Sequence, residues 1–258
     1  MMDNGLFCLF TFTVVACVIA LSWKLLDDLK GEAEYQTIRR IAGMEEGEKI
    51  MGPGGTDPGY GIQLPDIQED ILKSINPAYT AWLYIPDTEV NYPVVLSQDN
   101  QDYLKKTFEG NDNANGTLFF DCSNPPFSSL NTVIHGHNMK SGKMFGQLDG
   151  YLSYDFLNSH PLVYVFHQGI WSVYQIFAVY QADNQKTDPY RYLFSSRDAF
   201  TEFVKHCQQN SIYKASDKGT GVEEILTLST CYGKNKKLIV QAALLPQDTP
   251  YSSREVTE

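Results

Sequence analysis

The chain is short of basic residues and of cysteine. It holds 20 Lys and Arg against 31 Asp and Glu in 258 residues, which gives a formal net charge of −11. Nucleic-acid binding needs clustered positive charge, so this balance argues against a nucleic-acid partner. Five cysteines, with no Cys-x-x-Cys pair and no zinc-ligand spacing to histidine, exclude a disulfide scaffold and a zinc finger. With 43% hydrophobic and 20% charged residues, the chain is neither disordered nor a coiled-coil rod.

One long apolar run lies near the N-terminus. Residues 6–23, LFCLFTFTVVACVIALSW, hold no charge, glycine or proline. As a helix this run spans about 27 Å, close to the thickness of a bilayer hydrocarbon core. The alternative is a cleaved signal peptide, but the run is long for one, and no small-x-small cleavage site precedes Lys24. We expect an uncleaved membrane anchor at residues 6–23, preceded by a short N-terminal stretch at residues 1–5.

The flanking charges give a weak orientation signal. Four basic residues follow the span and none precedes it, which by itself favours a cytoplasmic C-terminus. Acidic residues are interleaved with them, however, so the signal is close to balance: the basic residues are Lys24, Lys30, Arg39 and Arg40, and the acidic ones are Asp27, Asp28 and Glu32.

A mixed segment separates the apolar run from the rest of the chain. Residues 24–50 are charged and compatible with a helix, and residues 51–61, MGPGGTDPGYG, are a loop or linker. Asp66 is placed to cap a short helix that ends before Pro77. We therefore predict a helical and Gly/Pro-rich linker region over residues 24–74 and a folded domain over residues 75–258.

The folded domain is mainly β. Eight short segments rich in β-branched and aromatic residues are bounded by Asn, Asp, Gly or Pro, which predicts a closed barrel or a sandwich. One helix interrupts them at residues 195–209, with Ser195 and Asp198 as a capping box and apolar residues at helical spacing. The predicted strands are residues 81–85, 90–96, 117–121, 132–135, 162–167, 171–181, 224–231 and 238–244.

Two residues at strand ends carry candidate chemistry. Cys231 closes the apolar strand ILTLSTC before the polar loop YGKNKK, where a thiol is partly exposed and can react. A cysteine nucleophile needs a base or counter-charge, normally histidine, and His137 follows the strand at residues 132–134. The residues leave open whether the two meet: Cys231 can equally be a small packed residue, and His137 a loop residue bonded to backbone.

Three other patterns compete. His135 and His137 form a His-x-His pair that invites a metal, but no third ligand is signalled nearby. Outside the cytoplasm, Cys122 and Cys207 are candidates for a disulfide bridge, although Cys207 lies on the apolar face of the predicted helix. The asparagines at 111, 113 and 115 echo the start of a calcium loop, but the match fails because its twelfth position is Cys122.

Several segments resemble one family. At TLSTC, residues 227–231, the chain resembles the sortases, the membrane-anchored cysteine transpeptidases of Gram-positive bacteria. NTVIHGHNMKSGKMFGQL, residues 131–148, is similar to the histidine segment of class B sortases, and AWLYIPDTEVNYPVV, residues 81–95, to strands that open the same fold. The helix at residues 195–209 matches the extra helix of class B. The resemblance covers roughly residues 75–245.

The resemblance implies a fold and a set of site residues. The fold is an eight-stranded sortase-type β-barrel with N-terminal helices and one helix inserted before the cysteine strand. Cys231 and His137 take the places of the family's catalytic cysteine and histidine. The family's catalytic arginine is replaced by Lys237, which keeps the charge but not the bidentate fork, and Lys236 or Arg191 are alternative cations.

Three residues near the catalytic pair are candidates for contact with the substrate. His135 stands where class B members usually carry tyrosine. Ser229 and Thr230 precede the nucleophile, and they can equally be ordinary strand residues.

The implied activity is acyl transfer at the cell surface. A single-pass protein of the cell membrane, with a cytoplasmic N-terminus and an extracellular catalytic domain, would cleave the C-terminal sorting signal of secreted surface proteins or pilins. It would transfer the acyl group to an amine of a cell-wall precursor or of a pilin lysine, without a cofactor or metal. The rival reading is a membrane-tethered peptide-binding module on the same barrel that lost turnover with the arginine.

Overall fold

The structure is a computed structural model that describes residues 4–45, 64–124, 126–185, 188–213 and 221–246. The predicted Gly/Pro-rich loop at residues 51–61 and the first three residues lie outside this part of the chain.

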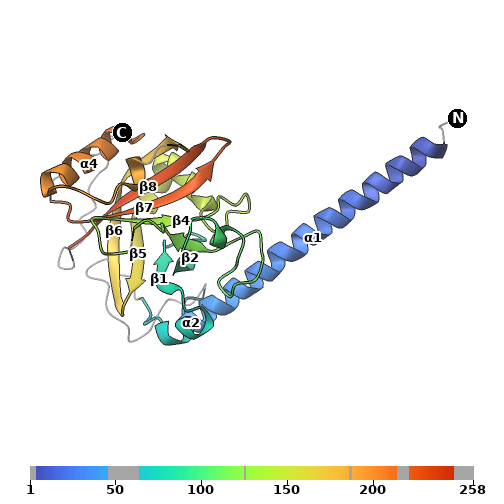
Figure 1. The fold of residues 1–258 in the computed structure, drawn as a ribbon, viewed down its shortest axis with the longest axis horizontal. Helices are drawn as coiled ribbons and strands as arrows, with labels where there is room; N and C mark the ends of the chain where they lie inside the picture. Colours follow the sequence, from blue (N-terminus) through green and yellow to red (C-terminus); the bar gives the residue numbers. More distant parts are fainter. Residues whose placement is uncertain (1–3, 46–63, 125, 186–187, 214–220, 247–258) are drawn as a thin grey trace.

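A closed barrel of eight strands forms the body of the molecule (Figure 1). The strands follow one another around the barrel in the order β1-β2-β3-β4-β7-β8-β6-β5. The pairs β2/β3 and β4/β7 are parallel, and the remaining pairs are antiparallel. The prediction of a mainly β, eight-stranded barrel is therefore confirmed, and the sandwich alternative is wrong. The strands are β1 Tyr79–Tyr84, β2 Asn91–Leu96, β3 Leu118–Phe120, β4 Asn131–His135, β5 Leu162–His167, β6 Ile170–Asp183, β7 Ile225–Tyr232 and β8 Lys236–Leu244.

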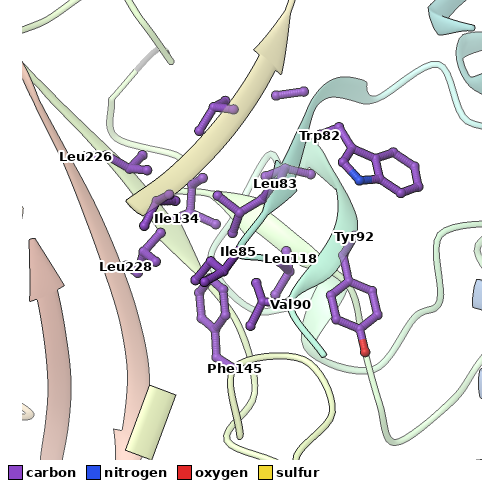
Figure 2. Packing of buried hydrophobic residues seen from close by; sticks show 14 of the residues in the cluster. Trp82, Leu83, Ile85, Val90, Tyr92, Leu118, Ile134, Phe145, Leu226 and Leu228 are labelled. Atoms are coloured by element: carbon purple, nitrogen blue, oxygen red, sulfur yellow. The ribbon is translucent and has the colours of Figure 1, made fainter. Parts of the chain in front are cut away.

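The core lies on both sides of the barrel wall because successive residues of a strand point to opposite faces. Figure 2 shows Leu83, Ile134 and Leu228, from three different strands, gathered on one side, while Trp82 projects to the other. Trp82 is fully buried, and its indole N–H donates to Asn91 Oδ1 at 2.8 Å. The Asn91 amide in turn donates to the Met44 carbonyl, so the outer layer joins the barrel to the chain that follows the first helix.

The predicted anchor and the helical part of the linker form one continuous helix, α1 Asn4–Ala42. Residues 9–26 are exposed, and Figure 1 shows this half of α1 projecting away from the barrel. Within the described residues, α1 is the one helix long and apolar enough to cross a membrane. Its C-terminal part changes character: Tyr35, Ile38 and Ala42 are buried against the domain.

Two predicted helix caps are wrong by one or two residues. The short helix α2, Glu69–Ile75, is preceded by Gln68 and not by Asp66, and no side chain caps it. The inserted helix α4, Arg197–Asn210, begins at Ser196, whose hydroxyl accepts a hydrogen bond from the Ala199 amide; Ser195 is not the cap. The apolar face predicted for α4 is confirmed, with Phe200, Phe203, Val204 and Cys207 buried.

Four short helical segments were not expected because they are too short to show a helical period. These are η1 Asp102–Leu104, η2 Gly146–Leu152, α3 Tyr154–Ser159 and η3 Asp188–Tyr190. Both η1 and η3 lie in loops that reach the site described next.

Candidate active site

Cys231 and Lys237 face each other across adjacent strands. β7 and β8 form an antiparallel pair joined by a tight turn, and their register places Cys231 opposite Lys237. The first six residues of β7 are buried, whereas Cys231 emerges into solvent, as its place at a strand end predicts. The Lys237 ammonium donates to Cys231 Sγ at 3.2 Å. Lys237 thus supplies the counter-charge that a cysteine nucleophile needs.

The parallel pairing of β4 with β7 brings the histidine segment to the same end of the barrel. The register runs from Asn131 opposite Ile225 to His135 opposite Ser229. Beyond it, the Gly136 amide donates to the Ser229 carbonyl, and the Thr230 hydroxyl donates to the Gly136 carbonyl at 2.8 Å. A Cβ on Gly136 would lie 2.4 Å from Leu118 Cδ2, so packing here requires glycine. These contacts fix the backbone immediately before His137.

The hydrogen bond made by His137 shows which of its two ring nitrogens is free for proton transfer. Nε2 lies 2.6 Å from the Leu104 carbonyl oxygen, at the end of η1. A carbonyl oxygen can only accept, so Nε2 must carry a proton in both the neutral and the charged ring. The ring nitrogen left for proton exchange is therefore Nδ1.

Cys231, His137 and Lys237 line one cavity of about 640 Å³. The strand-end geometry has thus brought together the three residues that the sequence proposed as catalytic. His135 and Ser229 also line the cavity, whereas Thr230 does not: it is buried and directed at Gly136. Further lining residues are Asn100, Leu104, Phe119, Asp121, Ser123, Gly136, Asn184, Asp188, Tyr190, Arg191, Tyr192 and Leu193.

One wall of the cavity is an ordered polar network. His135 Nε2 lies 2.8 Å from Asp121 Oδ2, and the Asp121 carboxylate also accepts from the Ser123 amide and from Asn100 Nδ2. Burial alone would raise the pKa of Asp121, but these hydrogen bonds and the imidazole outweigh it and lower the pKa to about 2. Asp121 therefore stays ionised and holds His135 in place.

A tyrosine continues this wall. The Tyr190 hydroxyl lies 2.8 Å from Ser229 Oγ, and its ring meets His135 edge-on, with centroids 5.3 Å apart. Burial raises the pKa of Tyr190, so its hydroxyl keeps its proton. Asp121 and Tyr190 were not among the site residues predicted from the sequence. The signal for Asp121 is its place at the end of a strand, LFFD, beside the histidine strand.

The two alternative cations occupy other positions. Lys236 Nζ donates to Gln181 Oε1 at 3.2 Å, and Lys236 does not line the cavity. The Arg191 guanidinium lies over the Phe194 ring, 5.0 Å from its centroid, at the cavity edge. Lys237 is thus the cation bonded to the sulfur.

The metal and disulfide hypotheses do not fit the site. His135 and His137 are bound to different partners, and the described residues contain no group of three or more His, Cys, Asp or Glu side chains that could hold a metal ion. Cys122 and Cys207 are both free thiols, one exposed and one buried in α4, so the proposed bridge between them is wrong.

Comparison with known proteins decides the family. The sortase domain matches residues 83–245 of the chain. The chain belongs to the sortase family. Sortase B of Listeria monocytogenes is 30% identical over 245 residues, which cover 91% of this chain and 95% of that protein. Sortase B of Staphylococcus aureus is 28% identical over 180 residues, covering 68% of this chain and 73% of that protein.

Solved structures agree with this assignment. Sortase B from B. anthracis superimposes with a TM-score of 0.70 at 27% identity, covering 86% of this chain and 99% of that one. Sortase B from Clostridium perfringens gives a TM-score of 0.65 at 30% identity, covering 69% of this chain and 100% of that one. The protein is a class B sortase, a cysteine transpeptidase.

Proposed function

We propose that this sortase cleaves the C-terminal sorting signal of secreted surface proteins and transfers the acyl group to an amine at the cell surface. One observation carries the proposal: the sulfur of Cys231, the ammonium of Lys237 and the ring of His137 share a cavity that opens to solvent. These groups supply a nucleophile, a counter-charge and an acid–base residue.

In the first step, the Cys231 thiolate attacks a backbone carbonyl of the sorting signal. A sulfur–carbon bond forms, and the π electrons of the carbonyl move onto its oxygen. Lys237 and backbone N–H groups near Cys231 stabilise this oxyanion. The ammonium of Lys237, which bonds the sulfur in the resting site, is close enough to follow the negative charge as it leaves the sulfur.

The intermediate then collapses, and the carbon–nitrogen bond breaks. Protonated His137 gives the proton on Nδ1 to the departing amine, while Nε2–H stays bonded to Leu104. The product is a thioester on Cys231. An incoming amine attacks this thioester and loses a proton to His137, and the new amide leaves with the thiolate restored. The acceptor is an amine of a cell-wall precursor or a pilin lysine, which distinguishes wall attachment from pilus polymerisation.

Substrate contacts are assigned to the ordered wall. His135, held by Asp121, and Ser229, held by Tyr190, present polar groups to the peptide from a fixed surface. Thr230 has a different role, because its hydroxyl is used on the Gly136 carbonyl. We assign it as a positioning residue for the backbone that carries His137.

The membrane assignment is carried by α1. Its exposed apolar half fits a single membrane pass. The orientation, with the N-terminus in the cytoplasm and the barrel outside the cell, is the one that the resemblance to sortases implies. This topology places the cavity on the same side of the membrane as secreted proteins and the cell wall.

The proposal is tested by incubating the full chain, in detergent, with a library of sorting-signal peptides and with either a cell-wall precursor amine or a lysine peptide. Mass spectrometry should detect a cross-linked product that is absent with Cys231→Ala. If peptides bind and are neither cleaved nor linked to the protein, the rival reading, a peptide-binding module without turnover, holds instead.

A further inference from the structure

We propose that residues 27–35 of α1, just beyond the predicted span, position His137 for catalysis. We name them the clamp segment. They contact the two chain segments that hold the histidine: a supporting loop at residues 102–117, which includes Leu104, and the segment that follows His137. The proposal rests on the acid–base role of His137 given above.

The asparagine-rich part of the supporting loop is bonded to the clamp segment through side chains and backbone. Asn113 Nδ2 donates to the Asp27 carbonyl at 2.7 Å and to Asp27 Oδ1 at 3.1 Å, and the Ala114 amide donates to Asp27 Oδ2. Two turns further along, Glu34 accepts from the Glu109 amide at 2.9 Å and from Asn111 Nδ2 at 3.2 Å. Two of the three asparagines that echo a calcium loop in the sequence, Asn111 and Asn113, thus bind a helix.

A short chain of contacts leads from the clamp segment to the catalytic ring. Tyr35 is buried, and its hydroxyl donates to the Gly116 carbonyl at 2.5 Å. Gly116 has a positive φ and lies against the carbonyls of η1: a Cβ there would be 2.7 Å from Tyr103 O and 3.0 Å from Leu104 O. The same Leu104 carbonyl bonds Nε2 of His137 at 2.6 Å. The position of Tyr35 therefore bears on the orientation of the imidazole.

The segment after His137 is fastened to the same part of α1. The Lys143 ammonium lies 3.1 Å from Asp28 Oδ2 and 3.3 Å from Glu32 Oε2, and all three side chains are largely shielded from solvent. The Phe145 amide donates to the His137 carbonyl at 2.9 Å. His137 is thus braced on both sides by backbone that the clamp segment holds.

At Gly31 the helix and the supporting loop approach each other closely. It is buried in the middle of α1, where glycine weakens a helix relative to alanine. A Cβ at this position would lie 2.7 Å from both Asn113 Oδ1 and Asn115 Nδ2. Glycine at this position allows the loop to sit directly against the helix.

These contacts predict a specific kinetic effect. The polar wall of the substrate cavity, built by His135, Tyr190 and Ser229, lies on other elements of the fold. Loosening the clamp should misplace His137 and slow turnover while leaving peptide binding unchanged. Because α1 is continuous, the helix that leads from the membrane also orders the active site.

The test uses Gly31→Ala in the full chain in lipid nanodiscs, with Thr37→Ala as the matched control. Thr37 is exposed on the same helix, and both changes favour helix formation by their propensity. Gly31→Ala should lower kcat about fivefold or more with KM within twofold, and should shift the ¹⁵N signal of the His137 Nε2–H group. Thr37→Ala should change neither. Wild-type kcat and an unchanged His137 signal in Gly31→Ala would overturn the proposal.

A second pair of variants keeps the test decisive if Gly31→Ala does not fold. Tyr35→Phe removes the hydroxyl that bonds Gly116, whereas Tyr151→Phe removes a similarly buried hydroxyl that bonds the His160 carbonyl at 2.8 Å. The clamp predicts a lower kcat and a shifted His137 signal for Tyr35→Phe alone; equal effects from both changes would refute it. If the wild-type chain fails on every peptide and amine, the proposed function fails, and the His137 signal still tests the clamp.

Discussion

The Lys237 ammonium lies 3.2 Å from the Cys231 sulfur, on the opposite strand of an antiparallel pair. The sortases that this chain resembles carry an arginine at this position, and that arginine contacts substrate carbonyls. In the resting site of this chain, the cation instead bonds the nucleophile. We therefore propose two tasks for Lys237: to stabilise the negative charge on sulfur before attack and the oxyanion after it.

Removing the Lys237 charge should remove both stabilising effects, the one on the sulfur and the one on the oxyanion. We expect Lys237→Ala to lower kcat/KM because the activation free energy rises by about 2.7–4 kcal/mol, the range typical of a lost oxyanion donor. The same variant should react more slowly with iodoacetamide at Cys231, because the thiolate loses its counter-charge. Lys237→Arg should keep activity, since its fork can reach two carbonyl oxygens. Near wild-type transpeptidation by Lys237→Ala would remove the role from this residue and direct attention to Arg191 and Lys236.

The two histidines should separate kinetically. His137→Ala should abolish acyl transfer because it removes the proton donor for the departing amine. His135→Ala should retain more activity and act mainly on KM, since His135 forms the cavity wall with Asp121. Steady-state kinetics of both variants, with and without a chelator, measure their kcat and KM. Equal inactivation by both changes in folded protein, together with chelator sensitivity, would favour a shared metal-binding role.

The Asp121 carboxylate predicts acid sensitivity. Its pKa is lowered to about 2 in the folded protein, so its contribution to stability is present above about pH 4 and is lost as the pH falls toward 2. The shift corresponds to on the order of 2 kcal/mol. Urea unfolding at pH 6 and pH 3 should show a larger loss for wild type than for Asp121→Asn. An identical loss in both proteins would mean that folding does not lower the pKa of the Asp121 carboxyl.

The cysteines should differ in reactivity. Burial raises the pKa of Cys207 to about 11, so this thiol should stay neutral and unlabelled at pH 8. Outside α1, the exposed cysteines of the described residues are Cys122 and Cys231, and of these two Cys231 has an ammonium against its sulfur. A substrate-mimic warhead followed by peptide mapping should mark Cys231, and Cys231→Ala should abolish the label. Labelling that moves to Cys122 or Cys207 in wild type would contradict the nucleophile assignment.

The sequence predicted most of the barrel because its strands carry their own local signals. β-branched and aromatic runs bounded by turn residues marked all eight strands, and a helical spacing of apolar residues marked α4. Local pattern could not choose between barrel and sandwich, since closure depends on pairings between distant strands. The two cap errors follow from the same limit: adjacent residues such as Ser195 and Ser196 differ only in backbone geometry.

The site was predicted in part. Cys231 and His137 stood out because each lies where a strand meets a loop, and Lys237 because it occupies the place of the family's arginine. Asp121, Tyr190 and Leu104 were missed because their roles exist only through contacts with residues far away in the chain. The sequence also did not predict that the anchor and the start of the linker form one continuous helix, because the apolar stretch and the charged stretch carry separate local signals.

The most direct test of the central claim is to look for the thioester on Cys231. The full chain is mixed with a sorting-signal peptide, quenched in acid and analysed by intact-mass and peptide-mapping mass spectrometry. The account predicts an acyl adduct on Cys231 that disappears when an amine is added, as the ligated product forms, and that never forms in Cys231→Ala. Bound peptide without any adduct, or an adduct on another residue, would contradict it.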